Sequence, residues 1–314
     1  MNQIKKAMIL AAGLGLRARP LTLVKPKALF PVLNRPVISY NLDLLAGIGV
    51  QEVAVNTHHL AAQLERQLSE INNHLAIHTF REEKILGTGG GVKNAAPFLG
   101  QDPFILINGV ILTSIDLSAV VGDHMAERPM ATLVLHDCPR FNNVGLDSTG
   151  LIRGFRGEWA APPEGLAWRT LAFTGIHIIE PELLAWIPEG PYDIIHTYQA
   201  LIKAGARVRA FVANDLTWRK IETRLDYLKI HGDLLTARAE GPVFEGSEVE
   251  VNPEAVIQGW ASLDEEVIIE AGALVKNSVL WKGARVAAGV RIVNSVLAEG
   301  VLAESDLNGG AKID

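Results

Sequence analysis

Cysteine is almost absent from this sequence: Cys138 is the single one among 314 residues. An internal disulfide and a cysteine-rich zinc site are therefore excluded, and we expect a reducing, cytoplasmic compartment. No apolar stretch is long enough to cross a bilayer, so no membrane partner is expected. A surplus of positive charge is missing too, because the formal net charge is −6. General nucleic-acid binding is disfavoured by that charge.

Two common phosphate-binding signatures are also missing. The chain has no G-x-x-x-x-G-K-[ST] segment, which argues against a P-loop NTPase. Gly13 and Gly15 begin a G-x-G pattern, but Ala18 stands where a dinucleotide-binding loop has its third glycine. Disorder is not expected, because 48% of the residues are hydrophobic. The length allows one large or two moderate domains.

What the chain does have is a glycine loop directly after an apolar run. Residues 7–12 predict a buried parallel strand, and Gly13 and Gly15 follow it. Glycines let backbone N–H groups turn toward an anion. Four basic residues follow in the same loop: Arg17, Arg19, Lys25 and Lys27. A triphosphate or pyrophosphate needs many donors and compensating charge, so we predict a phosphate site. The alternative is a glycine turn with a solvated basic face.

Strands and helices alternate over the first hundred residues. The apolar pattern predicts strands at 52–56, 75–80 and 103–107 and helices at 37–48 and 60–71. In the middle it predicts strands at 131–135, 175–179 and 208–212 and helices at 181–187 and 194–204. Such alternation indicates a doubly wound, Rossmann-like α/β sheet, whose ligands lie beyond the carboxyl ends of the strands. The first glycine loop, the loop 87–91 and the turn 108–109 all follow strands, so we expect them to converge.

The C-terminal part has a different pattern. Apolar residues recur every six positions: Val251, Ile257, Leu263, Ile269, Val275, Trp281, Ala287 and Val293. This period predicts a short left-handed parallel β-helix of hexapeptide repeats, and the alternative is a β-meander with chance periodicity. We predict domains over residues 1–240 and 241–314. About three coils are too few to be stable alone, so the β-helix should dock on the first domain or mediate a homo-oligomer.

The run from Gly13 to Lys27 resembles the signature of the sugar-1-phosphate nucleotidyltransferases, G-x-G-x-R-x-x-P-x-T followed by P-K. That family joins a nucleoside triphosphate to a sugar 1-phosphate and releases pyrophosphate. The resemblance implies that Arg17 and Lys27 hold the phosphates and are the catalytic residues. It also implies nucleotide contacts from Ala12, Gly13 and Gly15.

Two further regions carry the resemblance. Residues 82–91 resemble the family's second nucleotide loop, E-E-x-x-L-G-T-[AG]-G. The nucleotide-binding residues that it implies, together with one from the 108–109 turn, are Glu83, Gly87, Thr88 and Asn108. Residues 141–147 and 173–177 resemble the segments that line the sugar-phosphate pocket. The candidates there are Gly145, Asp147 and Gly175, although both glycines suit ordinary turns equally well.

The sequence departs from the family at both metal positions. The family holds Mg²⁺ with aspartates in N-G-D-x-L-T and W-x-D-I-G-T-P. Here Val110 and Lys220 occupy those positions, and Glu222 replaces the glycine. Valine offers no ligand and an ammonium repels a divalent cation, so no metal-binding residue is assigned and the family's Mg²⁺ is doubtful here. Asp116 and Glu222 are the carboxylates that could recruit a metal by another route.

Three functions remain open. The first is a nucleotidyltransferase with an altered site, and the second is a degenerate relative that still binds a nucleotide or nucleotide sugar as a sensor or regulatory subunit. The third is a scaffold with an empty pocket. The chemistry of the two metal positions favours the second. The loops look closest to the mannose-1-phosphate guanylyltransferases and the N-acetylmuramate-1-phosphate uridylyltransferases, but neither the base nor the sugar is fixed.

Overall fold

Contacts along the chain define two units in the computed structural model, which describes residues 4–71, 74–159, 167–214 and 216–314. The first unit comprises Met1–Gly13 and Ile38–Trp218, and the second comprises Leu14–Val37 and Arg219–Asp314. The signature loop is thus divided after Gly13, and most of it belongs with the C-terminal residues. The boundary predicted after residue 240 follows the change of sequence pattern and stays a prediction.

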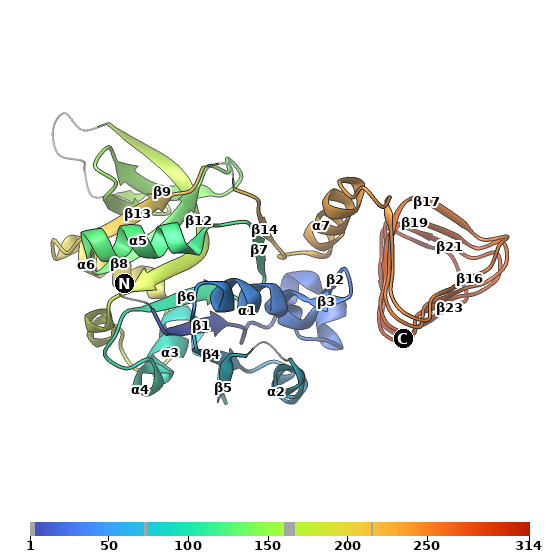
Figure 1. Ribbon diagram of the computed structural model, residues 1–314, viewed down its shortest axis with the longest axis horizontal. Coiled ribbons are helices and arrows are strands. Elements are labelled where there is room, and N and C mark those ends of the chain that lie inside the picture. The colour runs from blue at the N-terminus through green and yellow to red at the C-terminus, as the bar shows by residue number, and fades with distance from the viewer. Residues whose placement is uncertain (1–3, 72–73, 160–166, 215) are drawn as a thin grey trace. The chain divides into compact units, whose positions relative to one another are not determined.

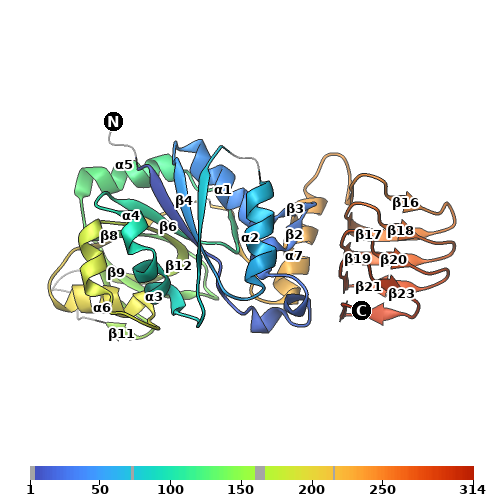
Figure 2. The ribbon, with the colours of Figure 1, turned by 90° about the horizontal axis from the view of Figure 1, so that it is seen from below.

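The first unit is built on one mixed sheet (Figures 1 and 2). Its central strand β1 (Lys6–Leu10) lies parallel to β4 (Glu52–Thr57) and β6 (Phe104–Asn108). The other strands are β5 (Ala76–Arg81), β8 (Ala131–His136), β9 (Asn142–Asp147), β10 (Ile152–Phe155), β11 (Glu158–Trp159), β12 (Trp168–Ile179) and β13 (Val208–Val212). Beyond β6 the sheet continues with the antiparallel strand β12.

Both faces of this sheet are covered, as a doubly wound fold requires. Met8 and Ile9 point to opposite faces of β1, and both are fully buried. The helices are α1 (Val37–Gly47), α2 (Ala61–Glu70), α3 (Gly87–Asn94), α4 (Ala96–Leu99), α5 (Leu117–Glu127) and α6 (Ile194–Lys203). The predicted α/β class is confirmed. Residues 181–187, predicted as a helix, form a short 3-10 helix, η4 (Pro181–Trp186). No helix among the described residues has the length and apolarity to cross a membrane.

The second unit contains stacked parallel strands that Figure 1 shows as a three-sided coil and Figure 2 shows from the side. One stack is β16 (Glu250–Val251), β18 (Ile268–Ile269), β20 (Arg285–Val286) and β23 (Leu302–Ala303). The other strands are β15 (Val243–Glu245), β17 (Val256–Leu263), β19 (Leu274–Leu280), β21 (Arg291–Val293), β22 (Val296–Leu297), β24 (Leu307–Asn308) and β25 (Ala311–Lys312). The pairing is consistent with the predicted parallel β-helix, while its left-handed winding stays a prediction.

The six-residue period does not continue through the whole coil. Val256 pairs with Leu274, 18 residues on, but Leu263 pairs with Leu280, 17 residues on. The offset changes because β17 has one extra residue next to Gly259, opposite Asn277, which has a positive φ of 46°. The predicted inward positions after Val275 are therefore wrong by one. The core residues are Leu280, Val286 and Ile292 instead of Trp281, Ala287 and Val293.

Trp281 is buried on a different side of the coil as a result. It is 1% exposed and packs against Phe30 and Tyr227, with ring centroids 5.2 and 6.4 Å away. Tyr227 belongs to α7 (Arg224–Thr236), and its hydroxyl accepts a hydrogen bond from Trp281 Nε1 (3.0 Å) and donates one to the Pro31 carbonyl. Three aromatic rings therefore join the loop 14–37, α7 and the coil within the second unit.

Replacing this indole tests the arrangement. We expect Trp281→Ala to lower the free energy of unfolding by about 3–5 kcal/mol, because a large buried ring is lost and a cavity remains. The control is Trp186→Ala, since Trp186 is 43% exposed and its loss should cost less than about 1 kcal/mol. Urea denaturation followed by circular dichroism measures both. Equal effects of the two substitutions would contradict the packing described for Trp281.

Candidate functional site

The end of β1 is tied to the end of β4 by one amide side chain. Asn56 pairs with Leu10 across the two parallel strands and is 3% exposed. Its Oδ1 accepts a hydrogen bond from the backbone N–H of Ala11 (2.7 Å), and its Nδ2 donates one to Glu82 Oε1 (2.7 Å). Ala12 and Gly13, two of the predicted nucleotide contacts, follow directly. Asn56 therefore fixes the direction in which the chain leaves the sheet.

Glu82 connects this strand end to the second glycine loop. Its carboxylate is buried, and Oε2 accepts a hydrogen bond from the Leu86 backbone N–H (2.8 Å). Sequence reasoning chose the neighbouring Glu83, which is exposed, and did not identify Asn56 or Glu82. A polar residue at the end of an otherwise apolar strand was the available signal for Asn56.

Gly87 and Thr88 begin α3 and lie against the start of α6. Gly87 has a φ of +71°, and a Cβ there would lie 2.8 Å from the Tyr192 carbonyl oxygen. Thr88 Oγ1 donates a hydrogen bond to Asp193 Oδ1 (3.1 Å) and accepts one from the Ile194 N–H (2.9 Å). Glu83, Gly87 and Thr88 are all exposed. This glycine loop is thus anchored by the Thr88 hydroxyl and by the Gly89 N–H, which donates to the Tyr192 carbonyl (2.8 Å), and its outer surface is open to solvent.

Asn108 and Gly175 lie together beside the same strand end. Asn108 pairs with Leu10, and a Cβ on Gly175 would lie 3.1 Å from the Cβ of Asn108. The Gly109 N–H donates a hydrogen bond to the Leu10 carbonyl (3.0 Å), and Asn108 Oδ1 accepts one from the Val110 N–H (3.2 Å). The structure therefore brings the candidates at the end of β1 together with Asn108 and Gly175. Val110, which follows Asn108 and Gly109 in the sequence, has a buried aliphatic side chain.

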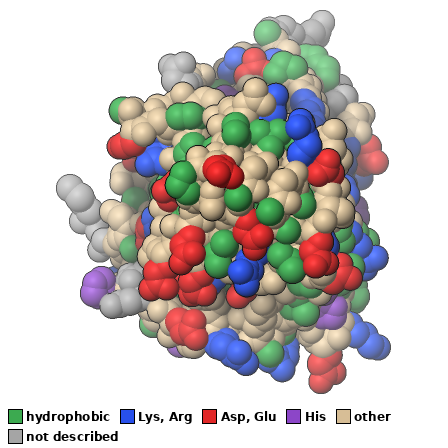
Figure 3. Space-filling model, turned by 90° about the vertical axis from the view of Figure 1, so that its right-hand side faces the viewer, with side chains coloured by type: hydrophobic (Ala, Val, Ile, Leu, Met, Phe, Trp, Pro, Cys, Tyr) green, Lys and Arg blue, Asp and Glu red, His purple; other side chains and the backbone are tan. Residues whose placement is uncertain are grey.

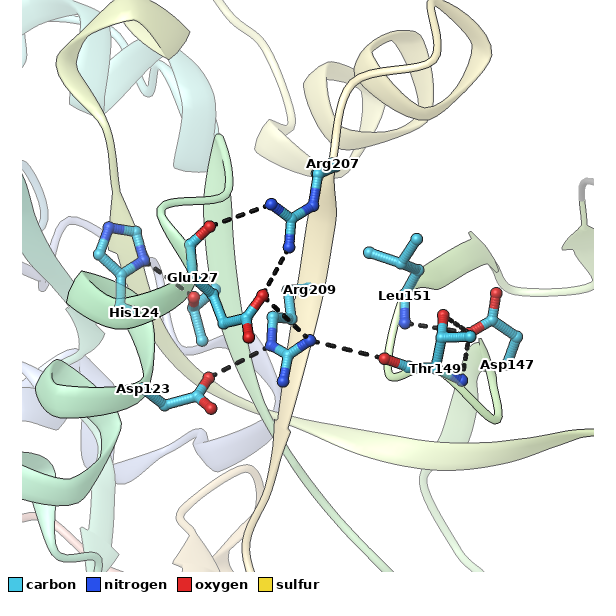
Figure 4. Close-up of polar contacts among 9 residues, drawn as sticks. Asp123, His124, Glu127, Asp147, Thr149, Leu151, Arg207 and Arg209 are labelled. Atoms are coloured by element: carbon cyan, nitrogen blue, oxygen red, sulfur yellow. Dashed lines mark hydrogen bonds and ion pairs between the residues drawn. The ribbon is translucent and has the colours of Figure 1, made fainter.

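Asp147 and Gly145 are placed by strand β9. The carboxylate of Asp147 is buried, and its oxygens accept hydrogen bonds from Thr149 and the Leu151 N–H (Figure 4). Arg153 Nε donates a further one (2.6 Å). Burial alone would raise the pKa of Asp147, but the bonds from Thr149 and Arg153 outweigh it and the pKa is lowered. Asp147 thus holds the β9–β10 turn, and Gly145 pairs with Thr170 of β12. Sugar-phosphate contacts from both remain predictions.

The signature arginine lies in the second unit, in the 3-10 helix η1 (Leu16–Ala18). It follows Gly15, whose φ of +63° forms the turn and whose carbonyl accepts a hydrogen bond from Thr22 Oγ1 (3.1 Å). Arg17 donates from Nη1 and Nη2 to the two carboxylate oxygens of Glu222 (2.9 and 3.2 Å). Lys220 Nζ lies 2.6 Å from Glu222 Oε1. One carboxylate therefore joins the signature arginine to the lysine at the family's metal position.

Lys27 begins the 3-10 helix η3 (Lys27–Leu29) and belongs to the same cluster. Burial, and then the positive charges of Arg17 and Lys220, lower its pKa from 10.5 to about 8, against the opposite influence of Glu222 and Asp226. Burial would raise the pKa of Glu222, yet Lys220 and Arg17 hold it below its usual value. We call Arg17, Lys27, Lys220 and Glu222 the cation cluster. It concentrates positive charge on an acidic protein.

The donor atoms at these positions do not fit Mg²⁺. Val110 has no ligand atom, and the Lys220 ammonium is itself a cation paired with Glu222. Asp116 caps α5 by accepting hydrogen bonds from the Ser118 and Ala119 N–H groups (2.9 and 3.2 Å). Within the described part of the chain, no three His, Cys, Asp or Glu side chains are grouped so that they could hold a metal ion. We therefore derive no chemical step through a metal.

Comparison with known proteins identifies the family. Residues 6–237 match the family model described as nucleotidyl transferase. The chain is 29% identical to a UTP–glucose-1-phosphate uridylyltransferase from Synechocystis sp., over 93% of this chain and 87% of that protein. It is 28% identical to a mannose-1-phosphate guanylyltransferase from Mycobacterium tuberculosis, over 95% of this chain and 81% of that protein. The chain belongs to the sugar-1-phosphate nucleotidyltransferase family.

Solved structures share the fold of about three quarters of the chain. The crystal structure of HddC from Yersinia pseudotuberculosis, complexed with GMP-PN, superposes with a TM-score of 0.60. The match covers 72% of this chain and 98% of that one, at 21% sequence identity. At this identity the likeness concerns the fold alone, and it agrees with the mixed sheet described above.

A glycine pair tests the network at the end of β1. A Cβ on Gly91 would lie 2.8 Å from Asn56 Nδ2 and 3.0 Å from Glu82 Oε1, whereas a Cβ on Gly122 would meet nothing within 4 Å. We expect Gly91→Ala to destabilise the protein by about 1–3 kcal/mol despite the better helix propensity of alanine. Gly122→Ala, inside α5, should stabilise it by about 0.5–1 kcal/mol. Thermal unfolding measures both, and stabilisation by Gly91→Ala would contradict the network.

The lowered pKa of Lys27 makes a second test available. Only a neutral amine reacts with an acylating reagent, so Lys27 should be protected below its pKa and react with a midpoint near pH 8, the pKa being about 8. Lys282 is the control, because hydrogen bonds to Glu265 and Glu266 raise its pKa and keep it protonated and unreactive over the same range. Acylation at several pH values, followed by peptide mass spectrometry, gives the two profiles. Indistinguishable profiles for the two lysines would overturn the electrostatics of the cation cluster.

Proposed function

We propose that the protein binds a nucleoside triphosphate or a nucleotide sugar as its family does, and that the transfer reaction is weakened or lost. The ancestral reaction is the attack of a sugar 1-phosphate oxygen on the α-phosphorus of the nucleotide, with release of pyrophosphate. The observation that carries the proposal is the ion pair between Lys220 and Glu222, 2.6 Å apart, at a position where the family has a metal-binding aspartate. Val110 replaces the other aspartate.

Binding is supported by the groups that remain. Gly13, Gly15, Arg17 and Lys27 retain the family's phosphate-binding pattern. The exposed loop at Glu83, Gly87 and Thr88 suits a base and ribose. Asn108 and Gly175, which lie together, suit the sugar nucleotide. Positioning and charge compensation are the protein's main contributions to such a transfer, and a divalent cation normally supplies much of the charge.

An active enzyme with an altered site is the second candidate function. The observation that favours it is Lys220 itself, because an ammonium at the metal position places a positive charge where the transferred phosphates would need one. The relatives include both a uridylyltransferase and a guanylyltransferase, so we propose no single nucleotide base. A non-catalytic scaffold or regulatory subunit, assembled through the β-helix, is the remaining alternative.

Turnover in Mg²⁺ distinguishes the first two candidates. We expect pyrophosphate release from UTP, GTP or dTTP with glucose 1-phosphate, mannose 1-phosphate or N-acetylmuramate 1-phosphate to be well below the usual enzyme range of about 1–10³ s⁻¹. The variant Val110→Asp/Lys220→Asp/Glu222→Gly restores the family's residues and should raise the rate by roughly 100-fold or more. Its partner Val110→Asp alone is the control and should change little. Rapid release by the unmodified protein would overturn the degenerate function.

A further inference from the structure

The cation cluster has its charges arranged by depth. The side chain of Glu222 is 9% exposed, whereas those of Lys220 and Arg17 are 31% and 66% exposed. The carboxylate therefore lies beneath the two cations, and the cations face solvent. Both ion pairs lie within the second unit.

Both cations keep hydrogen-bond donors that Glu222 does not use. Arg17 has five N–H donors and spends two on the carboxylate, and the ammonium of Lys220 has three and spends one. A guanidinium and an ammonium fixed side by side match two oxygens of a phosphate group. Ion pairing with Glu222 holds the two side chains in place before any anion arrives, which lowers the entropy lost on binding.

The charged groups around this site have a positive sum, which favours binding of an anion. Arg17, Lys27 and Lys220 are positive, while Glu222 and Asp226 are negative and both act electrostatically on Lys27. The carboxylate of Asp226 is already engaged in capping α7, where it accepts hydrogen bonds from the Thr223 N–H and hydroxyl (2.9 and 2.8 Å). One positive charge remains in excess, and it comes from the lysine that replaced an aspartate.

We propose that Arg17, Lys27 and Lys220 form a binding site for a triphosphate group that works without a divalent cation. Lys220 supplies, as part of the protein, the positive charge that a metal ion would otherwise bring with the nucleotide. This inference rests on the proposed nucleotide-binding function and specifies how its phosphates are held. The coil carries exposed carboxylates, among them Glu250, Glu254, Glu266 and Glu304. Figure 3 shows acidic side chains on the face that it views.

Calorimetric titration with and without metal tests the site. The probes are inorganic tripolyphosphate, UTP, GTP and dTTP, each in EDTA and in excess Mg²⁺, against the full-length protein. We expect tripolyphosphate and at least one nucleotide to bind in EDTA at least as tightly as in Mg²⁺. A bound Mg²⁺ would neutralise the negative phosphate charge with which Lys220 otherwise pairs. Binding in EDTA should weaken at elevated salt.

Variants of Lys220 identify the responsible charge. Lys220→Met should weaken tripolyphosphate binding in EDTA about tenfold or more, since a charge-assisted hydrogen bond is lost. Lys220→Arg keeps the charge and should stay within about threefold of the unmodified protein. Lys282→Met removes an exposed lysine that is also paired with carboxylates, Glu265 and Glu266, and should leave the affinity unchanged. Circular dichroism of each variant verifies folding.

The outcomes separate this inference from the function on which it rests. Nucleotide binding that requires Mg²⁺, or that is indifferent to Lys220→Met, overturns the metal-independent site and leaves the proposed function standing. Tripolyphosphate binding that depends on Lys220, without binding of any of the three nucleotides, supports the site and counts against the proposed function. Absence of binding by every probe in both solutions overturns both.

Discussion

Burial of the Glu222 carboxylate is the constraint on which the organisation of the second unit depends. With its side chain only 9% exposed, Glu222 cannot remain ionised without partners, because a buried unpaired charge costs several kcal/mol. Arg17 and Lys220 are those partners, so the signature loop is fastened to residues 219–222. The chain then enters α7 through a capping box at Thr223 and reaches the aromatic contacts of Tyr227. One ion-pair network thus connects the signature loop to the helix that packs on the coil.

Local pattern predicted the elements well and predicted the coil less well, for a specific reason. Strand β1 and helix α1 could be predicted because an apolar run and a 3.6-residue period each depend on neighbours in sequence. The coil depends on register between strands, and there two residues of β17, Gly259 and Trp260, lie opposite the single residue Asn277 of β19. Trp281 continued the six-residue period although Leu280 is the residue that faces the core. Since both are apolar, hydrophobicity alone could not distinguish the two registers.

The residues of the candidate site also fall into those that the sequence predicts and those that only the structure identifies. Arg17 and Lys27 could be proposed because their motif is contiguous, whereas Asn56 and Glu82 support the site through contacts between separate strands that no local spacing encodes. The role of Asp147 could have been read from its neighbours, since Asp-Ser-Thr-Gly is typical of a turn in which the aspartate accepts backbone N–H groups. The contact of Lys220 with Glu222 needed the structure, because a sequence shows two substitutions and not the distance between them.

Val110 and Lys220, at the two metal positions, are the basis on which we propose that binding and turnover separate in one site. An ammonium and a magnesium ion both attract phosphate oxygens, so a lysine can replace much of the charge that holds a triphosphate in place. Mg²⁺ also coordinates several oxygens at once in a fixed octahedral geometry, about 2.1 Å from the metal, and so stabilises charge that develops on a leaving group. A lysine has three donors on a flexible stem and cannot organise several oxygens in that way. Ground-state affinity can therefore persist where transition-state stabilisation falls, and only the latter accelerates the chemical step.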